Sequence, residues 1–120
     1  MEDFTERAYE VALEFVRERD ETFKNAWKIL KKIKEVAIEI LKDAKVYVFG
    51  SFARGDYKVY FSDIDVLIVS DRISNKMQER AEIKVEIRKR ANANYIFQIH
   101  LVNSKEFEFY KKFVDKLVEI

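Results

Sequence analysis

Residues able to bind a metal ion and phosphate groups are concentrated in one short part of the chain. Both glycines fall within the six residues Gly50-Ser51-Phe52-Ala53-Arg54-Gly55, and two aspartates, Asp63 and Asp65, follow beside an apolar run. Glycine lets the backbone turn with positive φ or come close to a ligand. Carboxylates at positions i and i+2 of a strand project from the same face, about 7 Å apart. A Gly-Ser turn beside two such acids is the kind of site that holds a metal-bound triphosphate.

The two aspartates favour a divalent cation over a structural role. Two carboxylates about 4 Å apart repel each other by about 4 kcal/mol at an effective dielectric constant of about 20. A structural strand in this apolar context would favour Val or Thr at such positions. A cation removes the repulsion, and Mg²⁺ prefers one or two carboxylates together with phosphate oxygens and water. We therefore predict that Asp63 and Asp65 bind Mg²⁺ or Mn²⁺.

The glycine turn supplies candidate phosphate contacts. Gly50 frees the backbone to turn after a strand, and Ser51 opens a short helix whose unpaired N–H groups and hydroxyl can bind an anion. Arg54, one helical turn later, can reach the same anion. The alternative role for Arg54 is an ion pair with Asp56 or Asp63.

Two helical segments and two strands are expected to position these residues. Apolar residues recur at helical spacing over residues 3–18 and again over residues 22–43. The charged run over residues 17–21 predicts a break between them, with a single long helix as the alternative. Residues 45–49 alternate as a strand that leads into the glycine turn, and the apolar run 64–69 is a second strand.

The rest of the chain adds a helix, a strand and a final helix. Ser74 is a candidate N-cap for a helix over residues 75–91. Residues 95–102 form a third predicted strand, and Asn103, followed by Glu106 three residues later, predicts the cap of the final helix. That helix is expected to bury a stripe made of Phe107, Tyr110, Phe113, Val114 and Leu117.

This order of elements predicts an α/β fold, in which a small mixed sheet of about three to four strands is flanked by helices. With 120 residues, 48% of them hydrophobic, we expect one domain over residues 1–120, with an additional N-terminal helix over residues 1–20.

Composition excludes several functional classes. The formal net charge of +1 gives no general attraction to nucleic acid or anionic membranes, so neither partner is expected. Without cysteine there is no disulfide, thiolate zinc site or cysteine nucleophile. No run approaches the roughly 20 apolar residues of a membrane span, and the acidic start Met1-Glu2-Asp3-Phe4 is unlike a signal peptide, so a cytoplasmic location is expected. The absence of proline and the abundance of Lys, Glu and Arg suggest a thermophilic source.

Gly50-Ser51, eleven intervening residues and Asp63-Ile64-Asp65-Val66 together resemble the signature of the DNA polymerase β-like nucleotidyltransferase superfamily. The small size and the string over residues 50–55 are similar to its minimal, single-domain members. The resemblance implies the polymerase β-like fold and transfer of a nucleoside monophosphate, in our first hypothesis AMP from ATP, to a hydroxyl group with Mg²⁺. It also implies that Gly50 and Ser51 contact the triphosphate, that Arg54 assists, and that Asp63 and Asp65 bind the metal.

The chain departs from the family pattern at one position. Family members typically carry a third acid on a later strand, which helps to bind the metal and to activate the attacking hydroxyl. The corresponding strand, residues 95–102, contains no Asp or Glu, and Gln98 is the best positional match. An amide cannot act as a base and binds Mg²⁺ weakly through one neutral oxygen. The alternative function is therefore an inactive or weakened member that acts as a protein-binding module.

The resemblance also suggests a protein partner. Minimal nucleotidyltransferases resemble the antitoxin half of toxin–antitoxin pairs whose partner is an all-helical HEPN protein, and a tyrosine of that partner can be the acceptor. The stripe on the first helix packs either on its own domain or on a second subunit of a homodimer. His100 is either a structural residue or a neighbour of the site, and the basic cluster over residues 84–90 favours a solvated helix face over a nucleic-acid contact.

Overall fold

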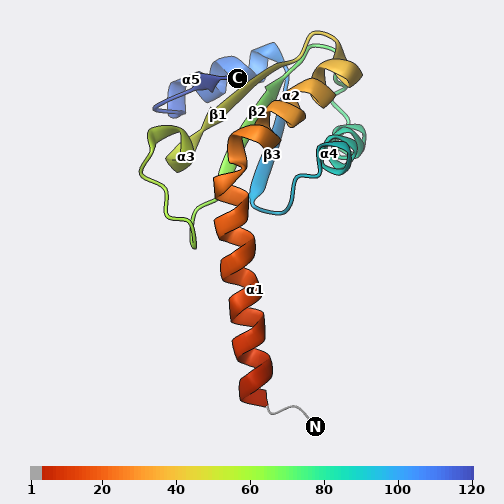
Figure 1. Cartoon of the computed structure of the whole chain (residues 1–120). Helices are drawn as coiled ribbons and strands as arrows, with labels where there is room; N and C mark the ends of the chain where they lie inside the picture. Colours follow the sequence, from red (N-terminus) through yellow and green to blue (C-terminus); the bar gives the residue numbers. More distant parts are fainter. Residues whose placement is uncertain (1–3) are drawn as a thin grey trace.

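The protein contains a four-stranded mixed β-sheet, seen in the computed structural model, which describes residues 4–120 (Figure 1). The strands are β1 (Lys45–Phe49), β2 (Ile64–Val69), β3 (Phe97–Val102) and β4 (Val118–Glu119), in the order β3-β2-β1-β4. Strand β2 is antiparallel to β1 and parallel to β3, and β4 pairs antiparallel with β1. The predicted α/β fold with a small mixed sheet is confirmed.

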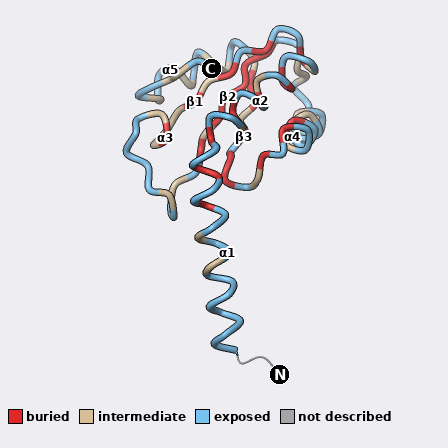
Figure 2. Tube along the Cα trace, in the orientation of Figure 1, coloured by how far each residue is buried: buried red, intermediate tan, exposed pale blue. Residues whose placement is uncertain are grey.

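The two faces of the sheet are covered unequally. Helices α2 (Ala26–Leu41) and α4 (Met77–Ala91) pack on one face and enclose the main core (Figure 2). The ten-residue α5 (Ser104–Phe113) packs on the other face through Phe107 and Tyr110. Because strand residues alternate between faces, this second face also carries the predicted site residues of β2 and β3. Buried side chains of the main core include Leu30, Ile33, Val48, Ile64, Ile68, Ile87 and Phe97.

A long first helix, α1 (Phe4–Lys24), extends away from the sheet and is followed by α2 after the single residue Asn25 (Figure 1). The predicted break over residues 17–21 is wrong, because Arg and Glu are good helix formers and the helix continues through them. The break falls at Asn25, whose side-chain amide donates to the Glu21 carbonyl (2.9 Å), the same oxygen that accepts from the Asn25 backbone N–H (3.0 Å). The added helix therefore reaches Lys24, and the first three residues of the predicted segment 1–20 lie outside the described residues.

Two predicted boundaries shift by a few residues for local reasons. Ser74 does not cap α4; its hydroxyl accepts from the Lys76 N–H (2.9 Å) in a turn before the helix, and Lys76 is the N-cap. Strand β3 begins at Phe97 rather than at residue 95, because Asn94 forms a turn by accepting from the Ile96 N–H (3.1 Å).

The final helix begins as predicted and ends earlier. Asn103 and Glu106 form a reciprocal capping box at its start. The helix stops at Phe113, which is 70% exposed, so the prediction that this residue belongs to a buried stripe is wrong. Val114 and Leu117 lie in the connection to β4, a two-residue strand held by its pairing with β1. Among residues 4–120, every helix is too short or too polar to cross a bilayer.

Candidate functional site

The glycine turn meets one of the two acids at the end of β1. Strand β1 ends at Phe49, opposite Asp65 of β2, and Gly50 turns the chain with φ +75° into the short helix α3 (Gly50–Arg54). A Cβ atom on Gly50 would lie 2.5 Å from the Asp65 Oδ2 atom. Glycine is required here for both its positive φ and the close approach of the carboxylate. The glycine turn after β1 and the Asp65 carboxylate of β2 therefore lie directly side by side.

The two aspartates offer carboxylate oxygens that no neighbouring donor uses. Asp63 is exposed and lies directly before β2, and Asp65, the second residue of that strand, is partly buried. Within residues 4–120 neither carboxylate accepts a hydrogen bond, and the nearest cationic candidate is the His100 Nε2 atom, 3.6 Å from Asp65 Oδ1. His100 Nε2 is itself buried without a hydrogen-bond partner, and its ring packs against Phe49 and Tyr110.

Asp65 lies between Phe49 of β1 and Gln98 of β3. Asp65 and Gln98 are paired in register between β2 and β3, so Gln98 completes a row that begins at Phe49. Its side chain is exposed, and its amide nitrogen donates to the Tyr95 carbonyl (2.8 Å). This orientation leaves the amide oxygen as the only atom of Gln98 that could face a cation.

Ser51 and Arg54 lie on α3 at the rim of the same region. Ser51, in the first turn, is partly exposed. Arg54 Nε lies 3.3 Å from Asp56 Oδ2, and its Nη1 lies 3.9 Å from Asp115 Oδ2. Both ion pairs are solvent-exposed and contribute little to stability, so the guanidinium can exchange them for an anion at small cost.

An arginine of α1 holds the loop that carries Asp63, a role that the sequence analysis did not assign. The Arg19 side chain is buried, and it donates from Nε to the Val59 carbonyl (2.6 Å) and from Nη2 to the Ser62 carbonyl. Ser62 directly precedes Asp63. The available signal was spacing: Arg19 falls four residues from both Phe15 and Phe23, on the apolar side of the helix, where an arginine must find buried acceptors.

Aromatic side chains pack α3 against the ends of α1 and α2 and against the loop before Asp63. Phe52 of α3 contacts Phe23 of α1, Trp27 of α2 and Tyr57 of the loop, with ring centroids 5.0–6.0 Å apart across this cluster. The end of α1 therefore supports both the glycine turn and the loop before Asp63.

The donor set fits a divalent cation that takes its other ligands from a substrate. In the described part of the chain no group of three or more His, Cys, Asp or Glu side chains is arranged to hold a metal ion. Asp63 and Asp65 provide two carboxylates with unused lone pairs, which is what Mg²⁺ takes from a protein when phosphate oxygens and water complete its shell.

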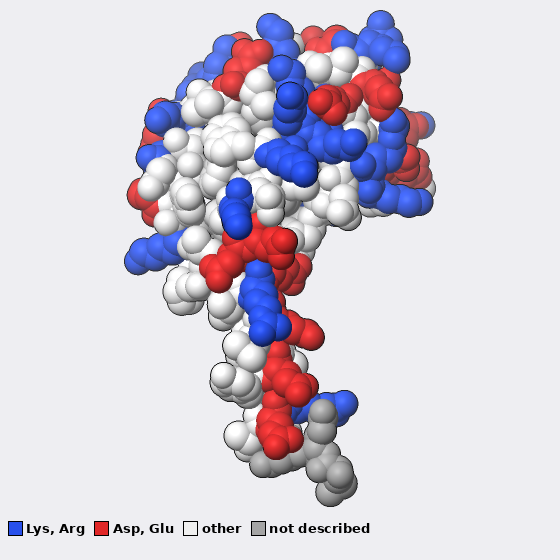
Figure 3. All heavy atoms as spheres, in the orientation of Figure 1, with Lys and Arg blue, Asp and Glu red and all other residues white. Residues whose placement is uncertain are grey.

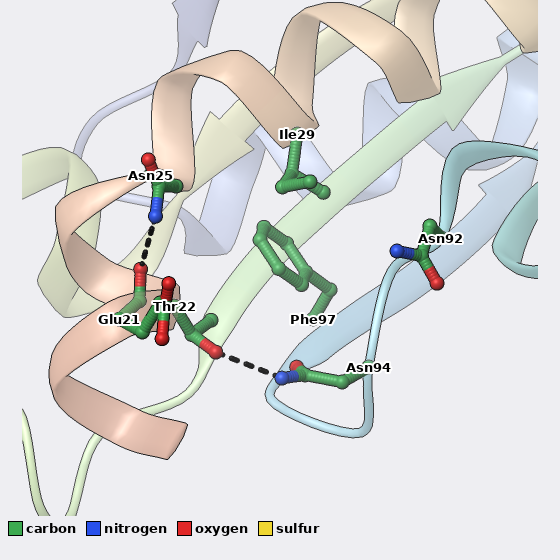
Figure 4. Close-up of a pocket in the computed structure, with 7 residues that line it drawn as sticks. All are labelled: Glu21, Thr22, Asn25, Ile29, Asn92, Asn94 and Phe97. Carbon is green, nitrogen blue, oxygen red and sulfur yellow. Dashed lines mark hydrogen bonds between the residues drawn. The ribbon is translucent and has the colours of Figure 1, made fainter. Parts of the chain in front are cut away.

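A separate small pocket of about 140 Å³ lies where α1 meets the loop before β3 (Figure 4). Its walls include Thr22 and Asn94, which are joined by a hydrogen bond (2.8 Å), and none of the residues discussed above as phosphate or metal ligands. This pocket therefore belongs to the attachment of α1 to the sheet rather than to the site.

Known proteins resemble this chain in sequence and in fold. The model of the nucleotidyltransferase domain family matches residues 30–120. A Methanocaldococcus jannaschii protein named "Putative protein adenylyltransferase MJ0141" is 40% identical over 62 residues, which cover 50% of this chain and 62% of that protein, less than two thirds of its length.

Two crystal structures share the fold. One, a "putative nucleotidyltransferase", superposes with a TM-score of 0.62 at 34% identity, and the match covers 75% of this chain and 95% of the other. The other, from Sulfolobus solfataricus and described in the same terms, has a TM-score of 0.54 at 25% identity and covers 82% and 84% of the two chains.

Proposed function

The chain belongs to the nucleotidyltransferase domain family, and we propose that it transfers a nucleoside monophosphate, AMP from ATP, to a hydroxyl group. Family membership implies a nucleoside triphosphate substrate and a divalent cation, which we assign as Mg²⁺ or Mn²⁺. The observation that carries the proposal is the close approach of the Asp65 carboxylate to Gly50, because it supports a site in which the turn binds phosphate and the acid binds metal.

Each residue of the site has a part in this reaction. Asp63 and Asp65 hold the cation, Gly50 and Ser51 receive the triphosphate, and Arg54 leaves its exposed ion pairs to contact phosphate oxygens. A cation held by these two acids would neutralise charge on the triphosphate and on the leaving pyrophosphate. A bond forms between the acceptor oxygen and the α-phosphorus while the bond from that phosphorus to the pyrophosphate oxygen breaks, and the hydroxyl proton passes to solvent water.

The acceptor is proposed to be a protein hydroxyl, a tyrosine of a HEPN-type partner. The name of the Methanocaldococcus jannaschii relative, a protein adenylyltransferase, supports a protein acceptor. The open, exposed surroundings of Asp63 and Gln98 also suit an acceptor carried by another molecule.

The position of Gln98 favours a second candidate, a nucleotidyltransferase fold that binds its partner without turnover. Its amide is bonded to the Tyr95 carbonyl and supplies no third carboxylate beside Asp65. In this case the protein would act as an antitoxin-like binding module.

One experiment separates the two. The protein is incubated with ATP labelled on the α-phosphate, Mg²⁺ and the product of the adjacent gene, and label on that product is measured. Transfer that disappears in Asp63→Asn and Asp65→Asn supports the enzyme. A stable complex that forms without label, and equally well with both variants, supports the binding module and overturns the transferase proposal.

A further inference from the structure

One buried nitrogen lies unpaired beside the proposed metal site. His100 is on β3, two residues after Gln98, and packs against Tyr110 of α5. Among residues 4–120, its Nε2 atom is the one buried side-chain nitrogen or oxygen that has no hydrogen-bond partner. The side chain is 37% exposed, but Nε2 itself is closed to solvent, so water cannot replace the missing partner. An exception of this kind in a folded protein needs an explanation.

The carboxylate of Asp65 lies just out of reach of this nitrogen. Its Oδ1 atom is 3.6 Å from Nε2, which is longer than a hydrogen bond. Its Oδ2 atom faces the glycine turn, where a Cβ atom on Gly50 would lie 2.5 Å away. A shift of about 0.5 Å would bring Oδ1 within bonding distance of Nε2. Because a carboxylate only accepts, Nε2 must carry the hydrogen, and it does so both in one neutral tautomer and in the charged ring.

Aromatic packing holds the imidazole in place more firmly than the Asp65 carboxylate is held. The ring centroid of His100 lies 5.3 Å from that of Phe49 and 6.2 Å from that of Tyr110, and these two rings are themselves 6.2 Å apart. The Asp65 side chain is 29% exposed, and within residues 4–120 its carboxylate accepts no hydrogen bond. Rotation of the carboxylate toward the nitrogen is therefore a smaller adjustment than movement of the ring.

We infer that His100 is a positioning residue of the metal site: its Nε2–H donates to Asp65 Oδ1 and leaves Oδ2, which faces the glycine turn, to the cation. The inference rests on the proposed function, because that proposal makes Asp65 a metal ligand. Carboxylates that bind metals are themselves usually hydrogen-bonded by neighbouring groups, which fix their direction. His100 is placed to supply that donor to Asp65.

Packing alone does not account for a histidine at this position. An apolar side chain would fill the space beside Phe49 and Tyr110 without burying an unpaired nitrogen, which costs stability. Direct ligation of the metal by Nε2 is the other role open to the nitrogen. In the part of the chain that the structure describes, however, His100 and the two aspartates are not arranged as a group that could hold a metal ion. This favours an action of His100 through Asp65.

The test measures Mn²⁺ binding to the full chain, without nucleotide, by electron paramagnetic resonance. His100→Gln places an amide nitrogen near the position of Nε2 and keeps a donor, whereas His100→Leu keeps an apolar side chain without one. We expect His100→Leu to weaken Mn²⁺ binding about tenfold, the effect of losing a group that orients a metal ligand. His100→Gln should bind nearly as tightly as the natural chain. Thermal melts should show both variants folded, with His100→Leu at least as stable as the natural chain.

Asp65→Asn is the reference for specific binding. Figure 3 shows acidic side chains along one side of the protruding α1, and Mn²⁺ held weakly by these carboxylates is common to all variants. Only the binding that Asp65→Asn loses is therefore assigned to the site.

The outcomes separate this inference from the proposed function. If the natural chain and Asp65→Asn bind Mn²⁺ alike, the metal site itself is absent, and the proposed function fails together with the inference. If Asp65→Asn loses binding and folded His100→Leu does not, the inference alone is overturned. Equal losses in the two His100 variants also overturn it, because a retained donor should rescue binding.

Pulsed electron paramagnetic resonance distinguishes positioning from direct ligation. The chain has one histidine, so in protein prepared without a histidine tag any imidazole nitrogen coupled to Mn²⁺ belongs to His100. We expect the coupling of a directly bound imidazole nitrogen to be absent. Its presence would make His100 a metal ligand and overturn the positioning role.

Discussion

Two pairs of aspartates lie at opposite ends of β2 and differ in how their oxygens are used. At the far end, Asp43 accepts from the Ser70 hydroxyl (2.5 Å) and the Asp71 N–H (2.9 Å), and Asp71 accepts from both the N–H (2.9 Å) and the hydroxyl (2.6 Å) of Ser104. At the other end, Asp63 and Asp65 accept no hydrogen bond within residues 4–120.

The difference separates acids whose oxygens are used in the fold from acids whose oxygens are unused and which we propose to bind a cation. Donors that fill the lone pairs of a carboxylate stabilise its charged form, and the pKa values of Asp43 and Asp71 lie below their usual range for this reason, through the Ser70 and Ser104 hydroxyls respectively. Lone pairs without donors are available to a cation. Sequence alone does not distinguish the two pairs, because Ser70 and Ser104, which donate to Asp43 and Asp71, come next to these acids only in the folded chain.

The largest expected effect comes from exchanging one acid of each pair for its amide. Asp65→Asn should lower nucleotidyl transfer about 1,000-fold, the scale on which loss of a principal electrostatic contact in a site acts, while leaving thermal stability unchanged or higher. Asp71→Asn should lower thermal stability and leave transfer nearly unchanged. Parallel activity assays and thermal melts measure both quantities. If Asp71→Asn abolished transfer in a folded protein, the distinction between the two pairs would be wrong.

The glycine turn allows a second, matched comparison. Gly50 and Gly55 both have positive φ, +75° and +86°, but only at Gly50 would a Cβ atom strike Asp65. Gly50→Ala should displace the carboxylate and lower transfer about 100-fold, since a 1 Å misplacement of a reacting group has that effect. Gly55→Ala carries the same backbone strain with nothing within 4 Å, so it should reduce stability and retain activity. Equal losses of activity would show that strain, rather than contact with Asp65, matters.

Local parts of this site could be predicted from the sequence because they depend on neighbouring residues. The strand before Gly50, the apolar run after Asp63 and the Asn103–Glu106 capping box all follow from periodicity and cap chemistry. The polar positions that depend on distant residues could not be predicted in this way. Ser70 has the pattern of a strand end, and spacing places Arg19 on the apolar side of its helix. Neither pattern identifies the acceptors, Asp43 and the Val59 carbonyl, that the fold brings to them.

The short strand β4 could not be predicted from local pattern either. Its two residues, Val118 and Glu119, have no pattern long enough to predict a strand, and they are extended because β1 offers a free edge to pair with. The boundary at Lys76 follows a single side-chain hydrogen bond in the turn before α4, which periodicity does not report.

Asp63 is held in place by its backbone rather than by its carboxylate. Arg19 donates to the Val59 and Ser62 carbonyls of the loop that leads into Asp63. Arg19→Met keeps the apolar stem and removes the donors to Val59 and Ser62, so the loop before Asp63 should loosen. We expect kcat/KM for the metal–ATP complex to fall about tenfold, mainly through a higher KM. Arg17→Met, an exposed position on the same helix, is the control and should behave like the natural protein. An unchanged KM in folded Arg19→Met would remove Arg19 from the site.

A substitution at Gln98 is expected to raise metal affinity and transfer rather than lower them. Gln98→Glu places a third carboxylate beside Asp65 in the register of β2 and β3, and so makes this end of the sheet still richer in unsatisfied oxygens. We expect Mn²⁺ to bind severalfold more tightly, because each additional carboxylate raises the affinity of a hard-cation site, and transfer to rise with it. Titration of Mn²⁺ followed by electron paramagnetic resonance measures the affinity without relying on turnover. If neither affinity nor rate changed, Gln98 would not occupy the third ligand position.

The smallest effect should come from acid titration of the satisfied pair. The folded-state pKa values of Asp43 and Asp71 are lowered, so their hydrogen bonds stabilise the fold above the ordinary aspartate pKa of 3.8, and this contribution is lost as the pH falls through the lower folded values. The melting temperature should therefore change little between pH 7 and about 5 on account of these groups and decline below about pH 4. Ser104→Ala removes one donor to Asp71, which brings the folded pKa of that carboxyl closer to its unfolded value, and it should flatten part of the decline. An acid limb identical in Ser104→Ala and the natural protein would mean that Asp71 does not contribute to it, and that the contrast between the two ends of β2 rests on Asp43 alone.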